Sequence, residues 1–154
     1  MKAHGLDMID ATIEGDSVAT SNEVIEKVGE VKEKFLIFPI TDQSTAPTVG
    51  NGIIGFAVPA SLDGWNLSGV LGAVYTSGSG TVTIQVRRRR SGSNVDMLST
   101  RLTITNAYSS TSCVINTSND DLSTGDMIYI DIDGATATQP TGLTVTLTIN
   151  KEIV

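Results

Sequence analysis

The stretch Leu143-Thr144-Val145-Thr146-Leu147-Thr148-Ile149 alternates strictly between apolar and hydroxyl side chains. Shorter runs with the same period occur at residues 81–86, 102–104 and 128–132. Successive side chains of a β-strand point to opposite faces, so each run has one apolar face and one polar face. Such strands bury their apolar faces against one another or against a second sheet. The sequence therefore predicts an all-β fold, a two-sheet antiparallel sandwich.

Turn-forming residues divide the chain into about eight strands, the number that a jelly roll requires. The run Phe35-Leu36-Ile37-Phe38 is apolar at every position, which predicts a strand buried on both faces, and Pro39 indicates an edge or a strand end. Residues 65–75 are long for one strand, so we expect a bulge at Gly69 or Gly72. The expected strands are 35–38, 53–58, 65–75, 81–90, 97–105, 113–116, 127–133 and 143–149.

Length and charge narrow the classes of function. A chain of 154 residues has the length of a single domain, and a domain of this size buries on folding about 70% of the surface that its unfolded chain exposes. The net charge of −7 argues against general affinity for nucleic acid or anionic membranes. The longest apolar run, residues 35–40, is far shorter than the roughly 20 residues that span a bilayer. No apolar leader follows Met1, so we expect synthesis in the cytoplasm of the producing cell.

Residues 1–34 differ from the rest, with eight acidic residues, four lysines and no aromatic side chain. We expect an N-terminal arm over 1–34 and a sandwich domain over 35–154. Within the arm, a seam at spacings of four, three and four favours a short helix over 22–34, and a β-hairpin turning near Gly29 is the alternative. So short a seam needs support from the sandwich or a neighbouring subunit. The seam residues are Val24, Val28, Val31 and Phe35.

The run Arg87-Arg88-Arg89-Arg90 is the sharpest charge feature. At a strand end these side chains point alternately to both faces. One interpretation is a solvated strand end; the other is a docking patch for an acidic surface, because arginine pairs with carboxylates in bidentate fashion. Because the arm is acidic, with Asp7 and Asp10, one hypothesis is that the arm of one subunit pairs with the arginines of another. The run also lacks the flanking aromatic residues on which proteins stack the bases of single-stranded nucleic acid, which argues against that partner.

Catalysis and cofactor binding find little support in the sequence. The single histidine, His4, lies in the arm, where it would make a poor base for a serine triad. Asp131 and Asp133 have oxygen ligands to offer calcium, but Gly142 stands where an EF-hand loop needs glutamate. The single cysteine, Cys113, excludes an internal disulfide and a cysteine-based zinc site, and we expect it to be buried. We expect no enzyme activity, no metal and no cofactor.

Trp65, Tyr75, Tyr108 and Tyr129 are the aromatic candidates for a sugar-binding surface. Trp65 shares its parity with Leu67 and Leu71, which predicts burial in the core or an interface. Tyr129 alternates with Ile128 and Ile130, which predicts a position on the outside of its sheet and a contact role.

The order of these pieces resembles a jelly-roll-like domain of tailed-bacteriophage virion proteins, over roughly residues 53–149. The resemblance is carried by Phe56-Ala57-Val58-Pro59, by Gly64-Trp65-Asn66-Leu67 and by the alternating strand at residue 82. It continues in Leu122-Ser123-Thr124-Gly125-Asp126 with the strand that follows, and in Thr141-Gly142-Leu143. Such domains occur in head-decoration (cement) proteins and in fibres, usually as homotrimers.

The resemblance implies a structural protein of the virion. We expect a homotrimer that binds the outer surface of the capsid, with the major capsid protein or other virion proteins as partners and multivalent contacts that stabilise the head. Neither nucleic acid nor membrane is an expected partner. The alternative is a fibre or receptor-binding head domain, with the arm as an attachment shaft and loops that recognise host surface glycans.

Overall fold

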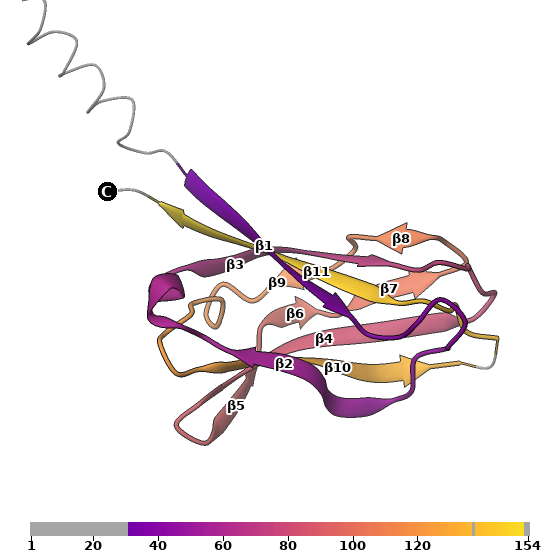
Figure 1. The fold of residues 1–154 in the computed structure, drawn as a ribbon, viewed down its shortest axis with the longest axis horizontal. Coiled ribbons are helices and arrows are strands. Elements are labelled where there is room, and N and C mark those ends of the chain that lie inside the picture. The colour runs from indigo at the N-terminus through magenta and orange to yellow at the C-terminus, as the bar shows by residue number, and fades with distance from the viewer. Residues whose placement is uncertain (1–30, 137, 153–154) are drawn as a thin grey trace, which may run out of the picture. The chain divides into compact units, whose positions relative to one another are not determined.

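Two β-sheets pack face to face in the computed structural model, which describes residues 31–136 and 138–152 (Figure 1). The first sheet has the strand order β1-β11-β3-β8, and the second has the order β2-β10-β4-β5, with β7 also paired to β4. A separate two-stranded ladder joins β6 to β9. The strands are β1 Val31–Pro39, β2 Gly50–Ala57, β3 Asn66–Ala73, β4 Thr81–Arg90, β5 Ser93–Asp96, β6 Leu98–Thr100, β7 Leu102–Thr105, β8 Ser109–Ser110, β9 Val114–Ile115, β10 Met127–Ala135 and β11 Thr144–Glu152.

The strand order is that of a jelly roll. β5 and β7 lie along the same side of β4 and count as one interrupted strand. With that count, and with the separate β6–β9 ladder left out, the first sheet holds the first, eighth, third and sixth strands, and the second holds the second, seventh, fourth and fifth. Most turns therefore carry the chain from one sheet to the other, as in a double Greek key. The predicted all-β antiparallel sandwich is confirmed.

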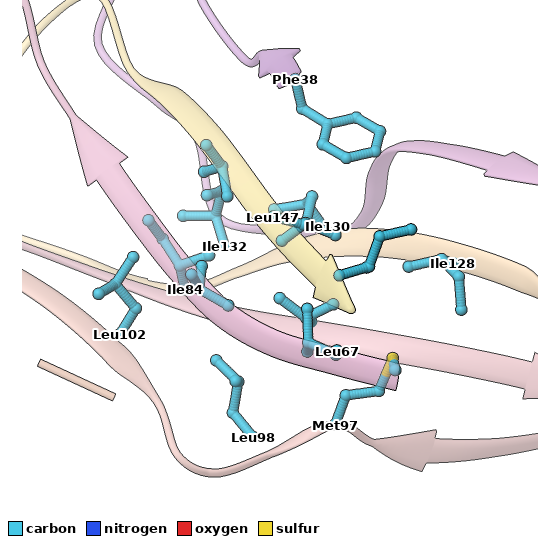
Figure 2. Close-up of a cluster of buried hydrophobic side chains, with 14 of the residues drawn as sticks. Phe38, Leu67, Ile84, Met97, Leu98, Leu102, Ile128, Ile130, Ile132 and Leu147 are labelled. Atoms are coloured by element: carbon cyan, nitrogen blue, oxygen red, sulfur yellow. The ribbon is translucent and has the colours of Figure 1, made fainter. Parts of the chain in front are cut away.

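The alternating stretches supply the core between the sheets. The apolar positions of β4, Val82, Ile84 and Val86, have no exposed surface. The corresponding positions of β10 and β11 are equally buried, and Figure 2 shows side chains from both sheets converging in this cluster. Fully buried members include Ile128, Ile130, Ile132, Val145, Leu147 and Ile149. These residues lie within Glu33–Lys151, which forms one compact unit.

The expected bulge in residues 65–75 is present at β3. Thr148 of β11 faces Gly69, whereas the next residue, Ile149, faces Leu67, so the ladder skips Ser68. Trp65, just before β3, is only 5% exposed, as predicted. The Nζ atom of Lys34 lies 4.6 Å from the centre of its ring.

The expected strand 97–105 is interrupted, which the sequence did not indicate. The side-chain amide of Gln85 accepts a hydrogen bond from the Leu98 N–H and donates one to the Leu98 carbonyl. This amide replaces the backbone pairing that a continuous strand would make with β4. Leu98–Thr100 pairs with β9 instead, and pairing with β4 resumes at Leu102.

The N-terminal strand also differs from expectation. It begins at Val31, so residues 31–34 are strand and the helix expected over 22–34 does not extend to them. The prediction that residues 35–38 are buried on both faces is wrong: Phe35 is 61% exposed and Ile37 is 66% exposed, while Phe38 is buried. The reason is the two-layer architecture, because β1 meets the core with one face only and the described chain places no further layer on the other face.

The described ranges contain no helix long and apolar enough to cross a membrane. Their helical structure is the short 3-10 turn Ala60–Leu62, which precedes β3.

Candidate functional site

The four arginines at the end of β4 alternate between the two faces of the second sheet, as predicted. Arg88 continues the inward face of Val82, Ile84 and Val86, and its side chain is 8% exposed. Arg87 and Arg89 lie on the outer face, beside the outward residues of β10 and β5. The run is therefore two separate surfaces and not a single basic patch.

Arg87 is paired within its own chain. Its Nε donates a hydrogen bond of 2.7 Å to Asp96, the residue opposite it on β5, and lies 3.2 Å from the carboxylate of Asp131. The bond to Asp96 raises the pKa of Arg87 further. The carboxylate of Asp131 is fully buried and accepts a hydrogen bond from the Gly52 N–H. Burial raises the pKa of Asp131, against the opposing effects of Gly52 and Arg87.

Arg88 and Arg90 form ion pairs with Asp121 and Asp126, in the segment that precedes β10. The Nη1 atom of Arg88 pairs with the carboxylate of Asp121 and also donates to its carbonyl oxygen. Arg90 binds Asp126 in bidentate fashion, at 2.8 Å and 2.7 Å, and its Nη1 lies 2.9 Å from Asp121. Hydrogen bonds from Arg90 hold the pKa of Asp126 below its ordinary value. These pairs stabilise the fold and leave Arg88 and Arg90 already engaged.

Arg89 is the arginine of this run for which the described residues provide no carboxylate partner. The register explains this, because Arg87 lies opposite Asp96 whereas Arg89 lies opposite the neutral Asn94. Arg89 is exposed, and on its other side it faces Met127 of β10.

Arg89 borders a hollow of about 350 Å³ on the outer face of the second sheet, which we call the outer hollow. Tyr129 lies on this outer face, as its alternation with Ile128 and Ile130 predicts, and it is half-buried. Met127 is 41% exposed and Asn51 is also exposed. The residues that line the outer hollow are Asn51, Gly52, Gly55, Arg89, Met127 and Tyr129.

A second surface is formed by the outward side chains of β1, Phe35 and Ile37, which we call the β1 face. They are among the most exposed large apolar residues in the described ranges. β1 is an edge strand, so one side of its backbone faces no partner strand in the described chain. Exposed apolar side chains on an unpaired edge are typical of protein–protein contact and are a hazard for aggregation when uncovered.

The remaining interface candidates are placed only in part. Asp7, Asp10, Val24 and Val28 lie outside the described residues, and Val31 is the first residue of β1. Pairing of the acidic arm with the arginines thus stays a prediction. If the arm pairs with the arginine run, Arg89 is the available member, because no aspartate of the described residues pairs with it.

The other chemical candidates have partners of their own. Asp133 pairs with Arg101, and Asp131 is held by Gly52 and Arg87, so these two carboxylates are engaged by the chain itself. Cys113 is half-buried, less enclosed than expected, and burial raises the pKa of its thiol.

Sequence reasoning missed most of the outer hollow. The signal available was Gly52 and Gly55, two of the three glycines in the strand 50–57, since glycine in a strand often marks a close approach of another backbone or a ligand. Comparison of the chain with protein-family models, with curated proteins and with solved structures finds no match.

Proposed function

We propose that this protein is a non-enzymatic structural protein of a tailed-phage virion, a homotrimer that decorates the outer surface of the capsid. The observation that carries the proposal is the β1 face, where Phe35 and Ile37 point away from the core of their own chain. Contact with further copies removes this apolar surface from water and protects the free edge of β1.

The sequence leading into β1 supports the same contact. Phe35, the last residue of the predicted apolar pattern Val24, Val28, Val31 and Phe35, is one of the two residues of the β1 face; the structure does not describe the side chains of the other three. An apolar seam that runs directly into an exposed apolar strand face is suited to a contact between copies. The threefold number of copies and the capsid as partner come from the resemblance to virion proteins.

In this proposal the trimer acts through multivalent contacts. Each copy contributes modest contacts to the capsid, and linkage of the copies raises their effective concentration at the surface. The acidic arm, with Asp7 and Asp10, supplies the charged groups with which a copy would meet its neighbours.

The test uses particles. Virions that lack the protein are expected to lose infectivity faster on heating and osmotic shock than intact virions, and purified protein added back should restore resistance. Protein with Phe35→Ser and Ile37→Ser should fail to restore it. Equal resistance of particles with and without the protein would contradict the proposal.

A fibre or receptor-binding head domain is the second candidate, and the outer hollow is the observation that favours it. The two roles differ in copy number. Gel densitometry of purified virions should show hundreds of copies for a decoration protein, and a few tens or fewer for a fibre.

A further inference from the structure

The outer hollow has the shape and the chemistry of a ligand site that assembly of the particle does not require. Its volume of about 350 Å³ is at the lower end of the range for small-molecule sites. Its floor comes from three neighbouring strands, β2, β10 and β4, whose ladders are regular from Met127 to Ile130; the β2–β10 register shifts beyond Ile130, where Asn51 and Gly52 lie. A site on such a floor is pre-formed and loses little free energy to ordering when a ligand binds.

Two glycines keep the hollow open. Gly55 lies opposite Tyr129, and a Cβ atom at this position would come within 2.7 Å of the Tyr129 Cβ. Gly52 has a φ of +63°, and a Cβ there would lie 3.9 Å from Tyr129 Cδ2. Both glycines line the hollow, so no side chain from either position covers the tyrosine ring from the β2 side.

The polar groups at the hollow select for a negative charge. Arg89 has its guanidinium free of carboxylates among the described residues, and a guanidinium binds a carboxylate through two parallel hydrogen bonds. The amide of Asn51 adds a donor and an acceptor suited to hydroxyl groups. The tyrosine ring and the Met127 side chain offer apolar surface between them.

The backbone of this site favours a saccharide over a peptide. Extended peptides gain affinity mainly from main-chain hydrogen bonds to a sheet edge. Here β10 is paired on both sides, with β2 and β4, and β4 is paired on both sides at Arg89, with β10 and β5. β2 is the edge strand of this sheet, and its unpaired main-chain groups point in the plane of the sheet, away from β10 and Tyr129. The outer face of the floor therefore offers no main-chain row, and recognition must come from side chains and from contact with a ring.

We propose that the outer hollow binds a carboxylate-bearing saccharide, of the uronic or sialic acid class, with the carboxylate on Arg89 and the sugar ring against Tyr129. The inference does not depend on where the protein sits on the virion, since a decoration protein and a fibre head can each carry such a site.

Isothermal titration calorimetry of the full chain tests the proposal with four probes: sialyllactose, trigalacturonic acid, neutral lactose and tetraglutamate. At least one of the two acidic sugars should bind, and Arg89→Gln should weaken that binding by about tenfold or more, as expected for loss of a bidentate charged pair. Arg101→Gln is the matched control, because it removes one exposed arginine charge away from the hollow. It should leave the affinity within about twofold.

Tyr129→Leu provides the second variant, and its thermal melting is measured to verify that it folds. It should lower the affinity for the same sugar without changing the oligomeric state. Equal binding of lactose and the acidic sugars, equal effects of Arg89→Gln and Arg101→Gln, or no heat of binding with either acidic sugar at millimolar concentration would overturn the proposal. Binding of tetraglutamate as tight as that of the sugars would assign the hollow to an acidic peptide instead. None of these results bears on the proposed role in the virion, which the particle-stability and copy-number experiments test.

Discussion

Arg88 and Asp121, 33 residues apart in the sequence, are joined by an ion pair and by a hydrogen bond from the guanidinium to the Asp121 carbonyl oxygen. The same guanidinium lies 3.4 Å from the carbonyl oxygen of Asn119. One inward-facing arginine therefore holds the segment before β10 against the end of β4. Next to it, the Leu67 N–H donates to the Asp120 carbonyl at 2.8 Å, which links this segment to β3.

Replacement of Arg88 by methionine is expected to loosen this segment. The variant loses charged hydrogen bonds from an almost buried donor, so the free energy of unfolding should fall by about 2 kcal/mol. Hydrogen exchange at the Leu67 amide should accelerate, as measured by NMR. Arg89→Met is the control, because its exposed side chain holds no carboxylate of the described chain, and it should change stability by less than about 0.5 kcal/mol. Equal losses in the two variants would contradict the assigned roles.

Gly55 should be intolerant of alanine. A Cβ at this position would lie 2.5 Å from the carbonyl oxygen of Ile128 and 2.7 Å from the Tyr129 Cβ, so the β2–β10 ladder would have to separate. We expect Gly55→Ala to lower the free energy of unfolding by about 1–3 kcal/mol in urea titrations.

Gly134 supplies the matched control for that substitution. It lies in β10, the strand that pairs with the β2 strand of Gly55, and a Cβ there would meet its nearest atom, the Thr83 Cβ, at an ordinary contact distance of 3.5 Å. Gly134→Ala should be close to neutral, within about 0.5 kcal/mol. A loss at residue 134 as large as that at residue 55 would show that backbone freedom, and not crowding, decides the effect.

The alternation in the sequence predicts the core residues and the outward position of Tyr129. A strand that packs on one face has apolar residues at every second position, so the sequence shows which residues face the core. It failed at residues 35–38, where four apolar residues in a row indicate burial on both sides. Whether the outer face of a strand is covered depends on whether another layer packs against it, and that is a property of the tertiary structure.

The partners of the arginines were equally beyond the reach of the sequence. The alternation predicts that Arg87 and Arg89 share a face, but only the register between β4 and β5 places aspartate opposite one and asparagine opposite the other. A shift of one residue in either direction would leave neither arginine opposite Asp96 or Asn94. The outer hollow depends on the same register, since Gly55 and Tyr129 meet only through the β2–β10 ladder.

The free energy of unfolding should depend on pH through the ionisation of Asp126. Its carboxylate is almost fully buried and bound by Arg90, which lowers its pKa in the folded state below the ordinary 3.8. The ionised form therefore stabilises the fold above about pH 3.8, and this stabilisation is lost as the pH falls through the lower folded value. We expect Asp126→Asn to reduce the free energy of unfolding by about 1.5–3 kcal/mol at neutral pH. The difference from the unmodified protein should shrink at about pH 3.

Asp131 should behave in the opposite sense. Burial raises its folded pKa above 3.8, so ionised Asp131 costs stability at neutral pH, and that cost is relieved as the pH falls through the raised value. Asp131→Asn should therefore destabilise the protein less than Asp126→Asn at neutral pH, in urea unfolding followed by circular dichroism. A larger loss for Asp131→Asn would show that its contacts with Gly52 and Arg87 outweigh the cost of burial.

The β1 face predicts the oligomeric state. Light scattering coupled to size-exclusion chromatography should give about three times the chain mass of 16.2 kDa for the unmodified protein. The double variant Phe35→Ser, Ile37→Ser should elute as a monomer with unchanged circular dichroism, because both side chains are exposed in the isolated chain and contribute little to its core. Tyr108→Ser, which removes an equally exposed aromatic residue at 66%, should remain trimeric. A monomeric unmodified protein, or a double variant that stays associated, would remove the β1 face as the contact between copies.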